Sequence, residues 1–227
     1  MNVKEGIFTR RSTRAFLADR QIEEETIREL IEIAGHSPSW SSSQPWEVYV
    51  VTGEKMNNLK EAWKAETLKG IPEHFDRSDI PGPGFDDWKE APLCVENMAI
   101  WKENRLNVMG VTKEEYGQIL SGLFLTHFDA PTCVYLCLNK SLSEYSYYDL
   151  GAFGQTLMLA ATERGIDTMA AYSPVMFGDL LHEELGIPEN TNIVLGIYMG
   201  YRDPDHFVNK PDAIQMDLDK YLKIITK

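Results

Sequence analysis

Three arginines and a serine lie together near the amino terminus. The segment TRRSTRAF, residues 9–16, places Arg10, Arg11 and Arg14 around the hydroxyl of Ser12. A guanidinium group matches two phosphate oxygens at once, and a nearby hydroxyl adds another hydrogen-bond donor. The cluster therefore suits a phosphomonoester or another small anion, although a solvated basic stretch paired with nearby acids would also explain it.

A second polar cluster occupies residues 37–46. Its sequence, SPSWSSSQPW, combines five serines and a glutamine with two tryptophans. Such a mixture can line a planar heteroaromatic ligand, because apolar faces hold the rings while a few polar groups bond the edge atoms. The other interpretation is a turn that ends a helix, with serine and proline as helix breakers.

Sequence signatures of other catalytic sites are missing. The chain has no GxGxxG, GxxxxGK[ST], GxSxG or HExxH motif, and its five histidines show no paired metal spacing. Its three cysteines, Cys94, Cys133 and Cys137, form no CxxC pair. The last two fall on one face of an apolar run, so we expect buried thiols. Any chemistry would have to be carried by a bound cofactor, with no catalytic side chain and no metal.

Helices and strands alternate around these clusters, which predicts an α/β sandwich of few strands. The clearest helix start is the pair Thr112 and Glu115, which form a capping box. Apolar periodicity predicts helices over residues 23–34, after residue 53 with Met56, Leu59 and Trp63 inward, and over 113–127, 150–161 and 175–186. Runs of β-branched and aromatic residues predict strands over 46–53, 132–138, 167–172 and 192–200.

Composition and charge narrow the function classes. The 227 residues carry a formal charge of −13, so the surface should repel nucleic acids and anionic membranes. No apolar run approaches the roughly 20 residues of a spanning helix, and the start lacks an apolar signal region. We expect a soluble, cytoplasmic protein with a single domain over 1–227. Prolines and glycines in residues 70–88 indicate an excursion from the fold, of the kind that often forms a lid.

Taken in order, the motifs resemble the FMN-dependent nitroreductase family, and most closely its branch that acts on nitroaromatics such as nitrobenzoates. The matching segments are RRSTRAF, SPSWSSSQPWEVYVVTG, FDAPTCVYLCL, DLGAFGQTLMLAATERGIDT and LGIYMGYRDPDHFVN. The resemblance implies an α+β fold with a central mixed sheet of four to five strands flanked by helices. It also implies an intertwined homodimer, with residues 70–110 as the excursion or lid and residues 205–227 as an extension that packs on the partner subunit.

The resemblance assigns binding roles but no catalytic side chain, because flavin N5 carries the chemistry. Implied cofactor-binding residues are Arg10, Arg11, Ser12, Arg14, Pro38, Ser39, Ser41, Gln44, Ala171, Tyr172, Ser173 and Lys210. The arginines and Ser12 would hold the FMN phosphate and ribityl chain, the segment 38–44 would border the flavin ring from the partner subunit, and the turn 171–173 would offer a backbone N–H to N5. Trp40 and Phe124 would border the acceptor.

The function implied is ping-pong hydride transfer from NADH or NADPH, through FMN, to nitroaromatic, quinone or similar electron-poor acceptors. Several positions depart from the pattern that the resemblance implies: Thr126 and His127 stand where many members have a Lys or Arg, and Asp212 where related members have arginines. Alternatives that stay open are an ene-reductase, a flavin reductase, an aromatic reductive dehalogenase, and a flavin-binding redox sensor with little turnover.

Overall fold

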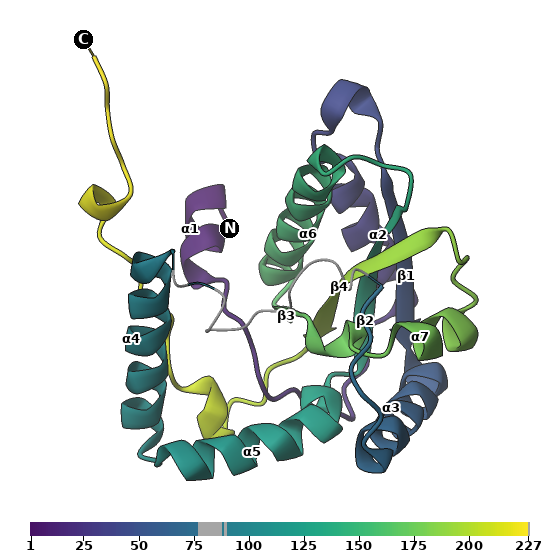
Figure 1. Ribbon diagram of the computed structural model, residues 1–227, viewed down its shortest axis with the longest axis horizontal. Coiled ribbons are helices and arrows are strands. Elements are labelled where there is room, and N and C mark those ends of the chain that lie inside the picture. The colour runs from purple at the N-terminus through teal and green to yellow at the C-terminus, as the bar shows by residue number, and fades with distance from the viewer. Residues whose placement is uncertain (77–87, 89, 227) are drawn as a thin grey trace.

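The computed structural model describes residues 1–76, 88 and 90–226. The helices are α1 (Val3–Thr9), α2 (Glu24–Gly35), α3 (Gly53–Lys69), α4 (Pro92–Met109), α5 (Lys113–Leu125), α6 (Tyr145–Glu163) and α7 (Gly178–Leu185). The strands are β1 (Trp46–Thr52), β2 (Thr132–Asn139), β3 (Asp167–Ala171) and β4 (Thr191–Gly200). The α+β class expected from the sequence is confirmed (Figure 1).

The strands form one sheet in the order β1-β2-β4-β3. Every pairing between these four strands is antiparallel, so the expectation of a mixed sheet is wrong for them. Among the described residues, parallel pairing appears only as two isolated bridges, Ser12–Thr168 at the β3 edge and His74–Phe177.

Both faces of the sheet are covered, which is why β2 is apolar throughout. Val134, Leu136 and Leu138 pack in a core with α2 and α6, whereas Cys133, Tyr135 and Cys137 pack in a second core with α3, α5 and α7. The expected burial of both strand cysteines is confirmed. Helix α6 comes close to β2 because Gly154 has no Cβ, and one built there would lie 3.1 Å from Leu136.

Sequence signals between neighbouring residues predicted the positions of most helices and strands. The Thr112–Glu115 capping box is present at the start of α5, and Met56, Leu59 and Trp63 are buried on α3 as expected. Helix α5 stops at Leu125, two residues early, because His127, Phe128 and Asp129 adopt positive φ angles. Helix α7 starts at Gly178 rather than 175, since His74 N–H bonds the Met176 carbonyl and Gly178 N–H bonds the His74 carbonyl.

Helices α1 and α4 had no sequence prediction. Figure 1 shows α4 standing away from the sheet, with α5 running between them and the carboxyl-terminal tail beside α4. Part of the expected 70–110 lid, residues 77–87 and 89, lies outside the described residues. Within the described part of the chain, no helix has both the length and the apolar character needed to cross a bilayer.

Candidate anion and flavin site

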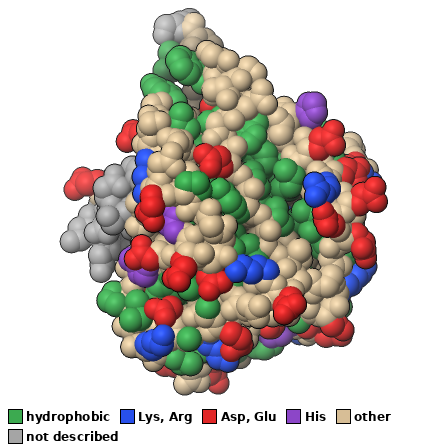
Figure 2. Space-filling model, turned by 90° about the vertical axis from the view of Figure 1, so that its right-hand side faces the viewer, with side chains coloured by type: hydrophobic (Ala, Val, Ile, Leu, Met, Phe, Trp, Pro, Cys, Tyr) green, Lys and Arg blue, Asp and Glu red, His purple; other side chains and the backbone are tan. Residues whose placement is uncertain are grey.

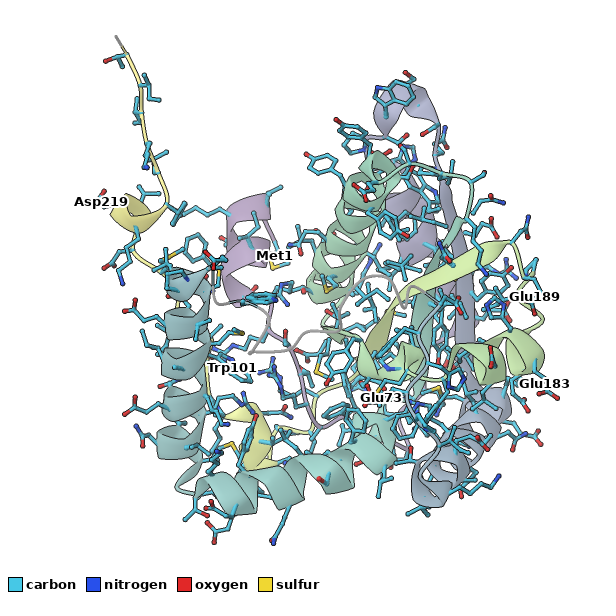
Figure 3. All side chains as sticks on the ribbon, viewed as in Figure 1. Met1, Glu73, Trp101, Glu183, Glu189 and Asp219 are labelled. Atoms are coloured by element: carbon cyan, nitrogen blue, oxygen red, sulfur yellow. The ribbon has the colours of Figure 1, made fainter. Side chains whose placement is uncertain are left out.

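A cavity of about 960 Å³ opens between α1, α4 and the segment that follows β4. Trp101, labelled in Figure 3, belongs to the side of α4 that lines it. The lining side chains include all four members of the amino-terminal cluster: Arg10, Arg11, Ser12 and Arg14. The sequence cluster is therefore gathered around one hollow rather than spread over the surface.

The backbone that carries this cluster is tied to the sheet edge and to the chain after β4. Thr13 N–H donates to the Thr168 carbonyl at 3.1 Å, beside the Ser12–Thr168 bridge. Arg14 N–H donates to Asn209 Oδ1 at 2.8 Å, and Asn209 Nδ2 donates to the Ala15 carbonyl at 2.9 Å. These bonds hold the segment extended, with Arg14 on the cavity side.

The arginines of the cavity differ in how their charge is balanced. Arg11 pairs with Asp212 at 2.7 Å, and Arg202 pairs with Asp167 at 2.9 Å. Arg10 and Arg14 have no carboxylate partner among residues 1–76, 88 and 90–226, and Arg14 Nη1 bonds only the Ser12 carbonyl, at 3.1 Å. Although the chain has a net charge of −13, positive charge is left uncompensated at this cavity. Figure 2 shows another face, where acidic side chains are more frequent than basic ones.

A third arginine of the cavity without a carboxylate partner among the described residues, Arg105 on α4, was missed in the sequence. Its side chain lines the cavity although the residue is only 2% exposed. Nε donates to the Tyr116 hydroxyl at 3.0 Å and Nη2 to the Val208 carbonyl at 2.8 Å. A usable signal existed in the helical spacing of Trp101, Arg105 and Met109, but it needed α4 to be recognised first.

Arg14 and Arg105 both lie near the indole of Trp101, and Arg105 also lies near the ring of Tyr116. Their Cζ atoms lie 5.4 and 5.5 Å from the Trp101 ring centroid, within the range of cation–π attraction. Burial, followed by the positive charge of Arg105, lowers the pKa of Arg14 from 12.5 to about 10. Burial at this site therefore disfavours the charged form of Arg14.

The serine-rich cluster lies in a separate place. A second hollow, of about 630 Å³, is lined by Glu32, Gly35, His36, Ser37, Pro38, Ser39, Ser42 and Gln44. Trp40 is 75% exposed, and Ser41 and Gln44 hold positive φ angles of 50° and 47°. In Figure 1 this segment lies beyond the end of α6, far from the start of α4. One copy of the chain does not bring the two clusters together.

The backbone of this segment is nevertheless well defined. Gln44 N–H donates to Ser39 Oγ at 2.9 Å, and Trp40 N–H donates to Asp149 Oδ2 at 3.1 Å. Because left-handed conformations cost energy in residues other than glycine, these bonds must stabilise them. The loop leaves Ser41, Ser42, Ser43 and Trp40 exposed, whereas Ser37 is buried with its hydroxyl 2.8 Å from Thr156 Oγ1.

The remaining predicted residues line neither hollow. Ala171 is the last paired residue of β3, Tyr172 is 44% exposed, and Ser173 is buried with Oγ 3.4 Å from the Tyr198 hydroxyl. Phe124 packs its ring against Trp63 at 5.2 Å, inside an aromatic cluster of the core. Lys210 is exposed.

His127 supplies no positive charge near neutral pH. It is fully buried, and burial lowers its pKa from 6.5 to about 3. Its Nδ1 lies 3.1 Å from the Tyr198 hydroxyl, and its ring meets the Trp63 edge at 4.8 Å. Likewise, burial raises the pKa of the Cys133 thiol to about 12, so it is not a nucleophile. No group of three or more His, Cys, Asp or Glu in the described ranges could hold a metal ion.

Comparison with known proteins identifies relatives along most of the chain. The model of the nitroreductase family matches residues 7–201. The chain is 35% identical to 4-nitrobenzoate reductase from Pseudomonas putida over 205 residues, which are 89% of this chain and 86% of the relative. It is 31% identical to nitroreductase NfnB from Mycolicibacterium smegmatis over 203 residues, which are 88% and 82% of the two chains.

A solved structure agrees with the fold. The crystal structure of FMN-dependent nitroreductase NfnB from Mycobacterium smegmatis, in complex with NADPH, has a TM-score of 0.84 and 27% identity, with 98% of this chain and 97% of that chain covered. The matched residues 7–201 include the arginine segment, the serine segment and all four strands. This chain therefore belongs to the nitroreductase family.

Proposed function

We propose that this protein is an FMN-dependent NAD(P)H oxidoreductase that reduces nitroaromatic or similar electron-poor acceptors. The observation that carries the proposal is the cavity in which Arg10, Arg14 and Arg105 have no carboxylate partner among the described residues. A phosphate dianion balances such charge and accepts several of the free N–H groups. The donor set thus fits the phosphate of FMN.

The relatives support the choice of acceptor and reductant. One is named 4-nitrobenzoate reductase, and another was crystallised as an FMN-dependent nitroreductase with NADPH. Bound FMN would accept hydride from the nicotinamide and pass two electrons to the acceptor. The part of this chain is to hold the phosphate through Arg10, Arg11, Ser12 and Arg14, and to offer backbone N–H groups at Tyr172 and Ser173 as charge develops on the flavin ring.

We also propose that the working form is a homodimer. The two hollows are separate within one chain, and large apolar side chains are exposed on three elements. Phe8 on α1 is 79% exposed, Tyr145 and Tyr148 on α6 are each 79%, and Ile225 in the tail is 85%. Covering these groups with a second copy would remove apolar surface from water.

In that dimer, Pro38, Ser39, Ser41 and Gln44 of one copy would border the flavin held by the other copy. Residues 205–227 would pack on the partner, and Trp40 and Phe124 would border the acceptor. Lys210, exposed here, would act on the phosphate only if dimer formation brings it to the cavity. Sedimentation of the purified protein tests this arrangement, since a stable monomer that holds FMN would contradict it.

The first test of function is the visible spectrum of the purified protein, with identification of the flavin released on denaturation. We expect near-stoichiometric FMN, bleaching by NADH or NADPH without oxygen, and recovery of the oxidised spectrum when 4-nitrobenzoate is added. A colourless protein that does not take up added FMN would exclude the proposal. Bleaching without recovery by nitroaromatics or quinones would instead favour the redox sensor, which the neutral His127 makes a specific alternative.

A further inference from the structure

We propose that Arg105 of α4, positioned by Trp101 and Tyr116, is a phosphate-binding residue of this protein and takes the place of the arginines that the family resemblance implies near position 212. This inference rests on the proposed function, because the phosphate is that of FMN. The segment after β4 reads Lys210, Pro211, Asp212 and Ala213, so it brings an acid to the cavity instead.

Arg105 has the features of a ligand-binding cation. It lines the same cavity as Arg10, Ser12 and Arg14, and it is 2% exposed. Two of its three nitrogens are fixed by Tyr116 and Val208, while Nη1 bonds no described residue. A buried guanidinium with an unused fork edge and no carboxylate is costly unless an anion binds it.

The surroundings of Arg105 explain how such a cation is held in place before the anion arrives. The Tyr116 hydroxyl and the Val208 carbonyl both accept from it, and the rings of Trp101 and Tyr116 lie 5.5 and 5.7 Å from its Cζ. Hydrogen-bond acceptors and π faces partly offset the charge without neutralising it. The fork is therefore fixed in orientation while its charge remains available to a ligand.

Arg14 contacts the same indole, with its Cζ 5.4 Å from the ring centroid. Two guanidinium groups that share one aromatic ring repel each other, and a dianion between or beside them removes that repulsion. Asp212 neutralises Arg11 instead, at 2.7 Å. Arg14 and Arg105 therefore remain available to the ligand, whereas Asp212 pairs with the more exposed Arg11.

The discriminating experiment measures the affinity of the flavin-free protein for FMN and for riboflavin, which lacks the phosphate, by quenching of flavin fluorescence. Arg105→Met is expected to weaken FMN binding about ten- to hundredfold and to leave riboflavin binding unchanged. Arg28→Met, on the exposed face of α2, is the matched control and should change neither. Equal weakening of both ligands would show a merely structural role and overturn the inference.

Second-site variants keep the test decisive. Asp212→Asn frees the Arg11 guanidinium in the same cavity, so it should restore part of the FMN affinity lost in Arg105→Met. If Arg105→Met does not fold, Tyr116→Phe removes one bond to Arg105 and should weaken FMN alone, by about two- to fivefold. Unchanged FMN affinity in Tyr116→Phe would then count against the inference. Unaltered protein that binds neither flavin would contradict the proposed function, whichever way the variants behave.

Discussion

The molecule buries charge in two regions and treats it in opposite ways. At the cavity, Arg14 and Arg105 lie within reach of one indole and have no acid beside them in the described ranges. Between α7 and β4, Asp76 and His182 are 7% and 8% exposed and bond each other at 3.0 Å.

In the second region, the polar side-chain groups form their hydrogen bonds with other groups of the protein. His182 Nε2 lies 3.0 Å from Asp76 Oδ2, and its Nδ1 lies 2.8 Å from the Ile187 carbonyl oxygen. Asp76 also accepts from the Ile193 N–H at 2.7 Å. A Cβ at Gly178 would lie 2.5 Å from the Asp76 carboxylate, so the glycine permits this close packing.

The contrast distinguishes charged side chains that stabilise the fold from charged side chains that bind a ligand. A buried pair whose donors and acceptors are all satisfied stabilises one arrangement of the chain, and removing one partner leaves the other uncompensated. A buried cation without such a partner lowers stability until something binds it. The first region should therefore respond to flavin and the second to unfolding, and the following variants test that division.

The largest effect is expected from Asp76→Ala. The change leaves both His182 Nε2 and the Ile193 N–H without their hydrogen-bond partner in a buried site, at a cost of about 3–5 kcal/mol in the free energy of unfolding. Urea unfolding of the flavin-free protein measures it. Asp179→Ala, whose exposed carboxylate lies 3.6 Å from His74, is the control and should cost less than about 0.5 kcal/mol. A loss below about 1 kcal/mol for Asp76→Ala would remove the contrast.

The next largest effect is expected from replacing both Arg10 and Arg14 with Ala. Losing two charge-assisted bonds to phosphate should weaken FMN binding by at least about a hundredfold, with loss of activity at low FMN. The free energy of unfolding without flavin should stay level or rise, because burial already disfavours the Arg14 charge. Fluorescence titration and urea unfolding report the two quantities, and unchanged flavin content would remove the phosphate assignment.

An intermediate effect on the free energy of unfolding is expected when the pH is lowered, because His127 is buried. Its pKa is about 3 in the folded protein and near 6.5 when unfolded, so the unfolded chain binds the extra proton between these values. The free energy of unfolding therefore falls as pH drops below about 6.5, by about 2 kcal/mol between pH 7 and pH 5. Urea unfolding of His127→Phe should show a flatter acid side, whereas His36→Phe, at an exposed position, should keep the original slope. Parallel curves for His127→Phe and the unaltered protein would contradict this.

The smallest effect is expected from Asp212→Asn in the otherwise unaltered protein. The Arg11–Asp212 pair is largely exposed, so its loss should change stability by less than about 0.5 kcal/mol. Freeing Arg11 should tighten FMN binding about two- to fivefold, measured by the same titration. Weaker binding would mean that Asp212 orients Arg11 for the ligand rather than competing with it.

The sequence was informative wherever neighbours along the chain decide the outcome. The Thr112–Glu115 capping box, the burial of Met56, Leu59 and Trp63, and the apolar run of β2 all depend on residues within a few positions of one another. The arginine cluster was also visible, because its members are adjacent. The early end of α5 was not, since three consecutive residues of positive φ leave no simple signal.

What the sequence by itself determined is the α+β alternation, the two polar clusters and the family resemblance that joins them. Only the tertiary structure decided which charges are balanced. It brought Arg105 of α4 to the cavity of Arg10 and Arg14, paired Asp212 with Arg11, and left the serine segment in a separate hollow. The physical reason is range: helix caps and strand faces depend on local geometry, whereas a charge is compensated by whichever group folding places within a few ångströms.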